Sequence, residues 1–342
     1  MAGPDGVRLG SRGCPTDKRL RSWVRDDFGV ELTALGRVDG GADTTAAVWR
    51  GATADGSRYA VKWSGGGSPA GLRVSSRLAE LGVPGVAAPV RTRSGGLWTE
   101  REGRRLSLLP WVSDTDGLDG RMAREQWQAF GSLLARVHGV VLPDRRLGDL
   151  PAEGPSPTAV ASAIREVGRR LDTVDAGDDD LVLELVAAWR SGMELVTSLL
   201  ARTASLARTL RDRPRPPAVV CHTDAHLGNV LVGAAGRVWL IDWDDAALAP
   251  RERDLMFAVG GLPGFAPVGR REQEWFFAGY GPADVDRTRL AYYRCVRALD
   301  DIAQLAAEVL DPDGDDRERA RWLRYARGEL DGAGLAGLAL AE

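Results

Sequence analysis

Two short stretches decide how this chain folds and which chemistry it can carry. The first reads HTDAHLGN at residues 222–229, and the second reads LIDWDD at residues 240–245. Asn229 is the only asparagine of the 342 residues, and Lys18 and Lys62 are the only lysines among the 45 basic residues. Asparagine and lysine codons are rich in A, so a GC-rich gene steadily loses them. The few that remain indicate positions where no other side chain serves.

The spacing of the acidic and amide side chains in these stretches is typical of a phosphoryl-transfer site. Transfer to an alcohol needs a carboxylate that orients the hydroxyl group and accepts its proton, and Asp224 suits that role. It also needs oxygen ligands for Mg²⁺, which Asn229 and Asp242 can supply. The apolar runs within residues 230–241 predict a β-hairpin that holds Asn229 and Asp242 side by side. Together the two stretches predict kinase chemistry.

The two histidines of the first stretch leave a second interpretation open. His222 and His226 have the i, i+4 spacing of zinc ligands on a helix, with Asp224 in the place of the general base. That arrangement needs a helix, whereas Gly228 and the surrounding β-like residues indicate a loop. We therefore expect His222 to pack beneath the loop, and a zinc hydrolase is the alternative.

A second group of residues predicts a nucleotide site. Lys62 ends the run YAVK on a predicted strand, where kinases place the lysine that holds the α- and β-phosphates. Upstream, Gly40 and Gly41 lie in the glycine-containing segment 36–44, whose backbone N–H groups are suited to cover phosphates. This segment lacks the full G-x-G-x-x-G pattern and fits a hairpin turn equally well.

Composition excludes several classes of protein. The net charge of -3 gives no reason to expect a nucleic-acid partner. No stretch approaches the roughly 20 apolar residues of a membrane helix, and residues 1–13 lack the apolar core of a signal peptide. The three cysteines have no metal-ligand spacing, which indicates free thiols. We expect a cytoplasmic protein without a membrane segment, either a monomer or a dimer.

The order of the predicted elements indicates an α+β protein with two lobes. A β-rich lobe over residues 1–108 precedes a helical lobe over residues 109–342, which carries the two stretches quoted above. Strands are predicted over 46–50, 58–63, 86–90 and 96–99, and helices over 20–28, 69–81, 123–138 and 181–210. Residues 106–111 form an apolar run that contains Pro110, after which the chain becomes helical.

Together these residues resemble the kinase-like aminoglycoside phosphotransferases, particularly their spectinomycin branch, from about residue 32 to about residue 310. The resemblance implies a protein-kinase-like fold and the use of MgATP or MgGTP. It also implies that Asp224 is the base, that Asn229 and Asp242 bind Mg²⁺, and that Lys62 binds the phosphates. The shared motifs include GGLWT at 95–99, the helix 126–139, DWDD at 242–245 and APRERDL at 249–255.

The same resemblance places further residues and shows two departures. Leu109 and Trp111 would belong to the hinge against which adenine docks. Thr223 replaces the arginine of protein kinases, and WD replaces FG after the metal aspartate, which favours a small substrate. Pro69 lies near the place where the family has a helix glutamate that pairs with the lysine. Glu80 is the nearest glutamate, and its pairing with Lys62 is an open question.

The substrate prediction rests on acidic residues. Asp300 and Asp301 lie on a predicted helix where the family lines its substrate pocket, and Asp245 follows the metal aspartate. Such acids suit a cationic amino sugar or aminocyclitol, although Asp300 and Asp301 also fit a solvated helix face. We expect phosphorylation of an aminoglycoside-like antibiotic, spectinomycin first, in resistance or self-protection. The alternatives are a kinase of choline, homoserine or a sugar, and a nucleotide-binding regulatory protein without turnover.

Overall fold

The computed structural model of the chain describes residues 14–38, 46–66, 68–119, 122–175, 177 and 179–341. Gly40 and Gly41 lie outside these residues. The chain divides into two compact units. The first unit comprises Met1–Ala152, Val219–Leu248 and Glu274–Pro282, and the second comprises Glu153–Ala218, Ala249–Gln273 and Ala283–Glu342. The predicted lobe boundary between residues 108 and 109 is a different division, and it stays a prediction.

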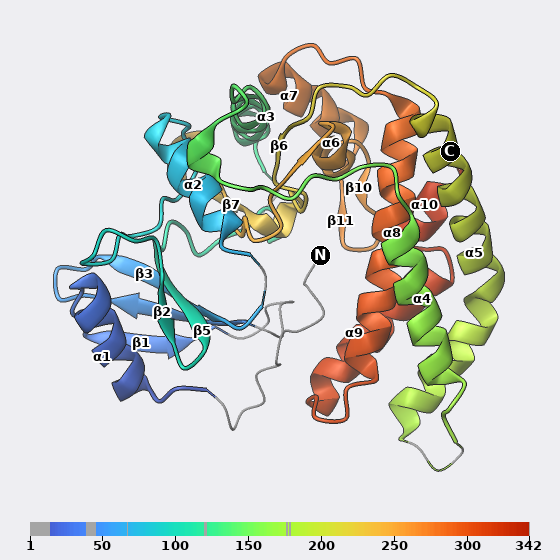
Figure 1. Cartoon of the computed structure of the whole chain (residues 1–342), viewed down its shortest axis with the longest axis horizontal. Helices are drawn as coiled ribbons and strands as arrows, with labels where there is room; N and C mark the ends of the chain where they lie inside the picture. The colour runs from blue at the N-terminus through green and yellow to red at the C-terminus, as the bar shows by residue number, and fades with distance from the viewer. Residues whose placement is uncertain are drawn as a thin grey trace. The chain divides into compact units, whose positions relative to one another are not determined.

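The first unit contains a five-stranded antiparallel sheet in the order β1-β2-β3-β5-β4. Its strands are β1 (Ala34–Arg37), β2 (Ala46–Ala52), β3 (Arg58–Ser64), β4 (Thr99–Arg101) and β5 (Arg104–Pro110). Alternate residues of a strand point to the same face, so Trp49, Val61 and Leu108 share one buried face. Helix α1 (Asp17–Phe28) lies against the sheet (Figure 1). Its Trp23 belongs to the same buried core as that face. The strands predicted over 46–50 and 58–63 are confirmed, and most of the apolar run 106–111 lies in β5.

The strand predicted over residues 86–90 is wrong. Val86 forms only an isolated bridge, to Leu240. Pro89 has no amide hydrogen for a strand ladder, and Gly85 turns the chain with a φ of 81°. Of the strand predicted over 96–99, only Thr99 lies in a strand, at the start of β4, because residues 92–96 form a turn in which the Gly96 nitrogen donates to the Thr92 hydroxyl at 2.9 Å.

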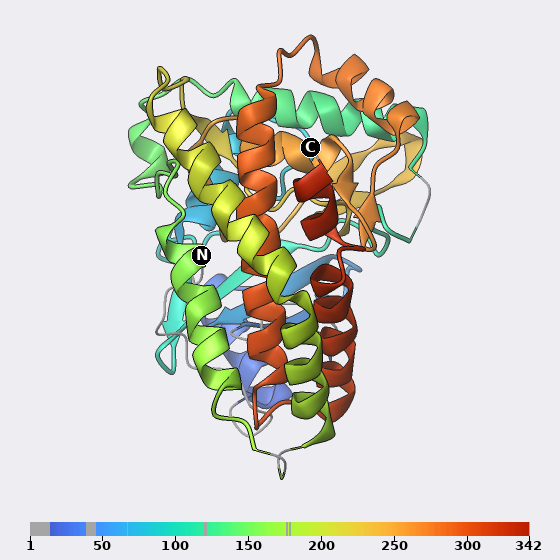
Figure 2. The same cartoon turned by 90° about the vertical axis from the view of Figure 1, so that its right-hand side faces the viewer.

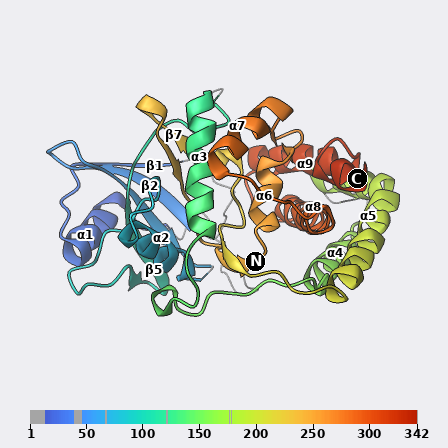
Figure 3. The same cartoon turned by 90° about the horizontal axis from the view of Figure 1, so that it is seen from above.

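Two helices of the first unit position the elements that follow. Helix α2 (Ala70–Glu80) begins directly after Pro69, as predicted. Helix α3 (Arg124–His138), also predicted, contacts β6 and β8 and lies beside the β7–β8 hairpin in Figure 3. Four short strands flank the two stretches singled out in the sequence. They are β6 (Val219–Cys221), β7 (Val230–Val232), β8 (Val238–Leu240) and β9 (Ala247–Ala249).

The second unit is mainly helical. Helices α5 and α8 contact each other and α9, and α4 packs on α8, so these helices lie side by side in Figure 2. The segment predicted as one or two helices over 181–210 is one helix, α5. The bounds are α4 (Thr158–Leu171), α5 (Asp180–Arg211), α6 (Glu252–Ala258), β10 (Gly261–Leu262), β11 (Ala266–Pro267), α8 (Arg287–Val309), α9 (Asp316–Leu330) and α10 (Leu335–Ala341).

Helix α7 (Arg270–Tyr280) begins in the second unit and ends in the first. It meets α3 through small residues, because a Cβ at Gly131 would overlap the Phe276 carbonyl oxygen and lie 2.7 Å from the Tyr280 nitrogen. Within the described residues, every helix is too short or too polar to span a membrane. A sheet followed by mainly helical structure confirms the predicted α+β class.

Candidate functional site

The hairpin of β7 and β8 brings the two sequence stretches together. Val230 pairs with Leu240 in the antiparallel register. Beyond that pair, the Ile241 nitrogen donates to the Asn229 carbonyl oxygen at 3.0 Å. Asn229 therefore lies beside the chain that leads into Asp242, as the sequence predicts. The segment between β6 and the 3₁₀ turn Leu227–Asn229 is a loop, so the helix required by the zinc interpretation is absent there.

The buried His222 ring contacts both sequence stretches. Its side chain is fully buried, and its ring lies 4.6 Å from the Trp243 ring, edge to face. Its Nδ1 accepts a hydrogen bond from the Asp224 nitrogen at 3.3 Å, so the neutral ring carries its proton on Nε2. That Nε2–H donates to the Ile241 carbonyl oxygen at 2.7 Å. The predicted packing of His222 beneath the loop is confirmed.

The carboxylate of Asp224 is oriented by two neighbours. The Asn229 amide nitrogen donates to the Asp224 carbonyl oxygen at 2.8 Å and to its Oδ2 at 3.1 Å. His226 Nδ1 accepts from the Gly228 nitrogen at 3.0 Å, which leaves the proton of the neutral ring on Nε2. This Nε2 lies 3.5 Å from Asp224 Oδ2. Asp224 is thus held in one orientation while a quarter of its side chain (25%) stays exposed.

Two residues of the site have a left-handed backbone. Thr223 has a φ of 70° and Asp242 a φ of 61°. This region is rare for residues other than glycine and costs most for a β-branched side chain, on the order of 1–3 kcal/mol. Buried contacts hold Thr223 there, since its hydroxyl group donates to the Asp245 carbonyl oxygen at 2.9 Å. Such strain is common at functional sites, and nothing in the spacing of the sequence indicates it.

Lys62 of β3 lies between two carboxylates of the second stretch. Its Nζ is 2.9 Å from Asp242 Oδ1 and 3.0 Å from Asp244 Oδ2. The lysine side chain is 16% exposed, Asp244 25% and Asp242 45%. Sequence reasoning assigned Lys62 and Asp242 to the site but missed Asp244 as a partner of the lysine.

The pKa values follow from this arrangement. Burial alone would lower the pKa of Lys62, but the charges of Asp242 and Asp244 outweigh it and raise that pKa above its ordinary value. The Lys62 ammonium lowers the pKa of Asp242. Burial, together with the charge of Asp242, raises the pKa of Asp244. Both carboxylates share one ammonium group, so they titrate as a coupled pair.

The donor set fits a hard divalent cation. Lys62, Asp224, Asp242 and Asp244 carry three negative charges and one positive charge, which leaves a formal charge of minus two. The Asn229 side chain uses its nitrogen for both of its hydrogen bonds, and its amide oxygen accepts none from the described residues. Carboxylate and amide oxygens of this kind are the ligands that Mg²⁺ prefers.

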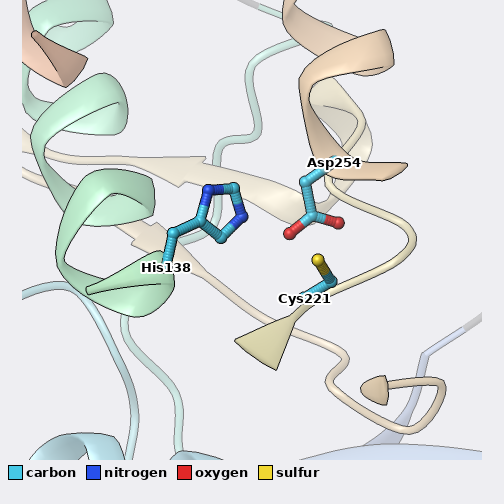
Figure 4. Close-up of side chains that lie close together, drawn as sticks. All are labelled: His138, Cys221 and Asp254. Carbon is cyan, nitrogen blue, oxygen red and sulfur yellow. The ribbon is translucent and has the colours of Figure 1, made fainter. Parts of the chain in front are cut away.

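Buried side chains anchor the strand that leads into the site. Cys221 at the end of β6 and His138 at the end of α3 are both buried, and a ring nitrogen of His138 lies within 4.8 Å of the Cys221 sulfur (Figure 4). His138 Nδ1 forms a hydrogen bond with the Tyr280 hydroxyl group at 2.7 Å. The sequence showed His138 on an apolar helix but gave no sign of these contacts.

The predicted hinge residues occupy the end of β5 and the chain beyond it. Leu109 pairs with Ala60 of β3. The Trp111 nitrogen donates to the Arg58 carbonyl oxygen at 2.9 Å, and its indole Nε1 donates to Asp114 at 2.8 Å. The contact of Leu109 and Trp111 with adenine stays a prediction.

The predicted substrate residues belong to different units. Asp245 is exposed in the first unit. Asp300 and Asp301 lie on α8 in the second unit, where Asp301 pairs with Arg297 at 2.7 Å and Asp300 accepts from Gln304 at 3.0 Å. The acids of α8 therefore have partners on their own helix, as on a solvated helix face. Their role toward a substrate stays a prediction.

Comparisons with known proteins place the chain in a family. A sequence model of the phosphotransferase enzyme family matches residues 34–291. A search of curated proteins finds no match. The crystal structure of spectinomycin phosphotransferase APH(9)-Ia with ADP and spectinomycin is similar, at 26% identity and a TM-score of 0.84, over 96% of this chain and 99% of that chain.

Two further structures share the fold at lower identity. The AMP-bound complex of the same phosphotransferase has 24% identity and a TM-score of 0.80, over 96% of this chain and 99% of that chain. Amicoumacin kinase hAmiN with AMP-PNP, Ca²⁺ and its ligand has 15% identity and a TM-score of 0.60, over 94% and 95%. The predicted protein-kinase-like fold is thereby confirmed. The chain belongs to the phosphotransferase enzyme family and is a small-molecule kinase.

Proposed function

We propose that this kinase transfers the γ-phosphoryl group of ATP to a hydroxyl group of an aminoglycoside or aminocyclitol antibiotic, with spectinomycin as the first candidate. One observation carries the chemistry: Asp224 and Asn229 share hydrogen bonds, while Lys62 lies within 3 Å of the carboxylates that follow β8. The similarity to a phosphotransferase bound to ADP and spectinomycin supports the choice of nucleotide and acceptor.

The residues divide the reaction among them. The acceptor oxygen attacks the γ-phosphorus as the bond to the ADP oxygen breaks, and Asp224 accepts the proton of the hydroxyl group. Lys62 binds the α- and β-phosphates. Asn229 and Asp242 would hold Mg²⁺, which when bound neutralises charge on the phosphates. The hydrogen bond from Asn229, with the His226 ring 3.5 Å away, keeps the Asp224 carboxylate oriented.

The acceptor class is proposed from charge. Asp245, Asp300 and Asp301 are acidic and would attract a cationic aminocyclitol. The same chemistry on another small alcohol, such as choline, homoserine or a sugar, is the second candidate. Amicoumacin kinase shares the fold, so the fold alone accommodates different acceptors. GTP is the alternative phosphoryl donor.

Release of ADP or GDP, coupled to NADH oxidation, tests this proposal with a panel of acceptors. We expect turnover with ATP, Mg²⁺ and spectinomycin, a phosphomonoester signal in ³¹P NMR, and a raised inhibitory concentration in a susceptible bacterial host. Turnover with choline or homoserine, and none with spectinomycin, would assign that alcohol as the acceptor instead. Nucleotide binding without turnover on any alcohol would overturn the proposed activity, as would activity that requires Zn²⁺ instead of Mg²⁺.

A further inference from the structure

Asp244 stands at a position that the proposed chemistry leaves unassigned. It lies two residues after Asp242, and its Oδ2 is 3.0 Å from Lys62 Nζ. Its side chain is more buried than that of Asp242, 25% against 45% exposed. The Asp244 carboxylate and the Lys62 ammonium form a largely buried ion pair, so little water lies between the two charges. Asp244 is therefore in a position to fix the lysine.

A helix glutamate does not perform this task here. Glu80, the last residue of α2, accepts from Arg146 at 2.8 Å and from Arg91 at 3.1 Å, and it lies 3.4 Å from Arg77. Lys62 is paired with Asp242 and Asp244 instead. This answers the question that the sequence left open, since the nearest glutamate of α2 is engaged by three arginines.

The start of α2 explains why Asp244 can replace a helix acid. Gly71, in the first turn, packs directly on the backbone of Trp243 and Asp244. A Cβ at this position would lie 2.8 Å from the Asp244 nitrogen and would overlap the Trp243 carbonyl oxygen. The helix and the chain after β8 are thus in backbone contact, which leaves no space for a side chain at position 71. The contact fixes Asp244 where it can reach β3.

A bound metal ion would leave Lys62 in need of a second carboxylate. Lys62 is shared between Asp242 and Asp244 in the structure, and Asp242 is a proposed Mg²⁺ ligand. A carboxylate that coordinates a cation has less charge to offer a neighbouring ammonium group. Without Asp244, Lys62 would compete with the cation for Asp242. With Asp244, the lysine keeps a partner.

We propose that Asp244 is the positioning residue of Lys62, and that with Gly71 it takes the place of a helix glutamate in aligning the lysine for the nucleotide phosphates. This inference rests on the proposed function for the role of Lys62 but not for the identity of the acceptor. Asp244 acts through the lysine, so its effect must disappear when the lysine is absent.

A double-mutant cycle tests this dependence. The variants Asp244→Asn, Lys62→Met and the double variant are compared by kcat/KM for ADP release and by calorimetric ADP affinity in EDTA. We expect Asp244→Asn to lower kcat/KM about 10- to 100-fold, because a lysine displaced by about 1 Å loses its alignment. In the Lys62→Met background, the same substitution should change kcat/KM less than about twofold.

ADP affinity without metal gives a readout that does not depend on turnover. Asp244→Asn should weaken ADP binding while Lys62 is present. In the Lys62→Met background it should leave binding unchanged or strengthen it, because only repulsion between Asp244 and the phosphates then remains. Glu80→Gln is the matched control, and it should change neither ADP affinity nor kcat/KM.

Two outcomes would overturn the inference. Equal losses from Asp244→Asn with and without Lys62 would show that Asp244 acts directly on metal or substrate. Wild-type kcat/KM and ADP affinity in Asp244→Asn would show that Lys62 is positioned without it. Failure of the wild-type protein to phosphorylate any alcohol would overturn the proposed function instead, and the ADP-binding cycle would still test Asp244.

Discussion

Helix α2 has a charged cluster at each end, and the two clusters have opposite compositions. Near its first turn, one ammonium group, that of Lys62, meets the carboxylates of Asp242 and Asp244. At its last residue, one carboxylate, that of Glu80, meets the guanidinium groups of Arg77, Arg91 and Arg146. The first cluster has excess negative charge and the second excess positive charge.

The two clusters differ in the exposure of their side chains to solvent. The Lys62 side chain is 16% exposed, whereas Arg91 is 55% and Arg146 68% exposed. Charges at the Glu80 end are screened by water and salt, and such pairs contribute little free energy. The Lys62–Asp244 pair, at 16% and 25% exposed, is less open to that screening. The excess negative charge of the Lys62 cluster favours binding of a cation there.

The largest effect on activity is expected at Asp224, which belongs to the same candidate site as the first cluster. Asp224→Asn keeps the size of the side chain but removes the proton acceptor, so kcat should fall about 10²- to 10⁴-fold. ADP affinity should stay near that of the wild-type protein, since Asp224 has no assigned contact with the nucleotide. Stopped-flow or coupled ADP release measures kcat, and calorimetry measures affinity. Turnover within tenfold of the wild type would refute the assignment of the base.

Removal of a metal ligand should have the next largest effect. Asn229→Ala deletes the amide oxygen and should raise the Mg²⁺ concentration for half-maximal activity at least about tenfold. It also removes the hydrogen bond to Asp224, so excess Mg²⁺ should restore activity only in part. Mg²⁺ with ADP should raise the Tm of the wild-type protein more than that of the variant. Equal stabilisation of both would exclude Asn229 as a ligand.

Sequence reasoning predicted the first cluster in part because its signals are local. The spacing of Asp224, Asn229 and Asp242 reflects a loop and a hairpin, and a hairpin fixes the positions of its ends. Lys62 was identified by its rarity. Asp244 was missed as its partner because a contact between β3 and the chain after β8 depends on tertiary packing, which spacing does not encode.

Errors at other places have local as well as tertiary origins. The strand predicted over residues 86–90 has apolar, β-branched residues, yet Pro89 and the turn at Gly85 prevent a ladder from forming. The left-handed backbone of Thr223 is imposed by buried neighbours and leaves no mark on composition. Whether the acids of α8 bind substrate depends on parts of the chain that belong to different units.

The backbone contact at Gly71 gives a prediction of intermediate size. Gly71→Ala forces α2 away from the Trp243–Asp244 peptide, so it should lower kcat/KM about tenfold and destabilise the fold by about 1–3 kcal/mol. Gly328→Ala on α9 is the matched control, because a Cβ there meets nothing within 4 Å. That control should stabilise the protein by about 0.4–1 kcal/mol. Unchanged kcat/KM in Gly71→Ala would show that the position of α2 does not affect the site around Lys62.

The smallest effect is expected at the other end of α2. The hydrogen bond from Arg146 is the main cause of a lowered pKa of Glu80, despite an opposing contribution from burial. A carboxylate whose pKa is lowered in the folded state adds stability above its unfolded pKa and loses it as pH falls through the folded value. Glu80→Gln should therefore lower Tm slightly at neutral pH, by no more than about 2 °C, and not at all in acid.

Salt distinguishes this small effect from the effects at the lysine end. At about 1 M NaCl the screening length is about 3 Å, so the Tm difference between Glu80→Gln and the wild type should vanish at neutral pH. The activity loss of Asp244→Asn should persist, because its ion pair is only 25% and 16% exposed. If high salt removed both the Tm difference of Glu80→Gln and the activity loss of Asp244→Asn, the ion pairs of the two clusters would be equally screened. Lys62 would then be as freely solvated as the arginines around Glu80.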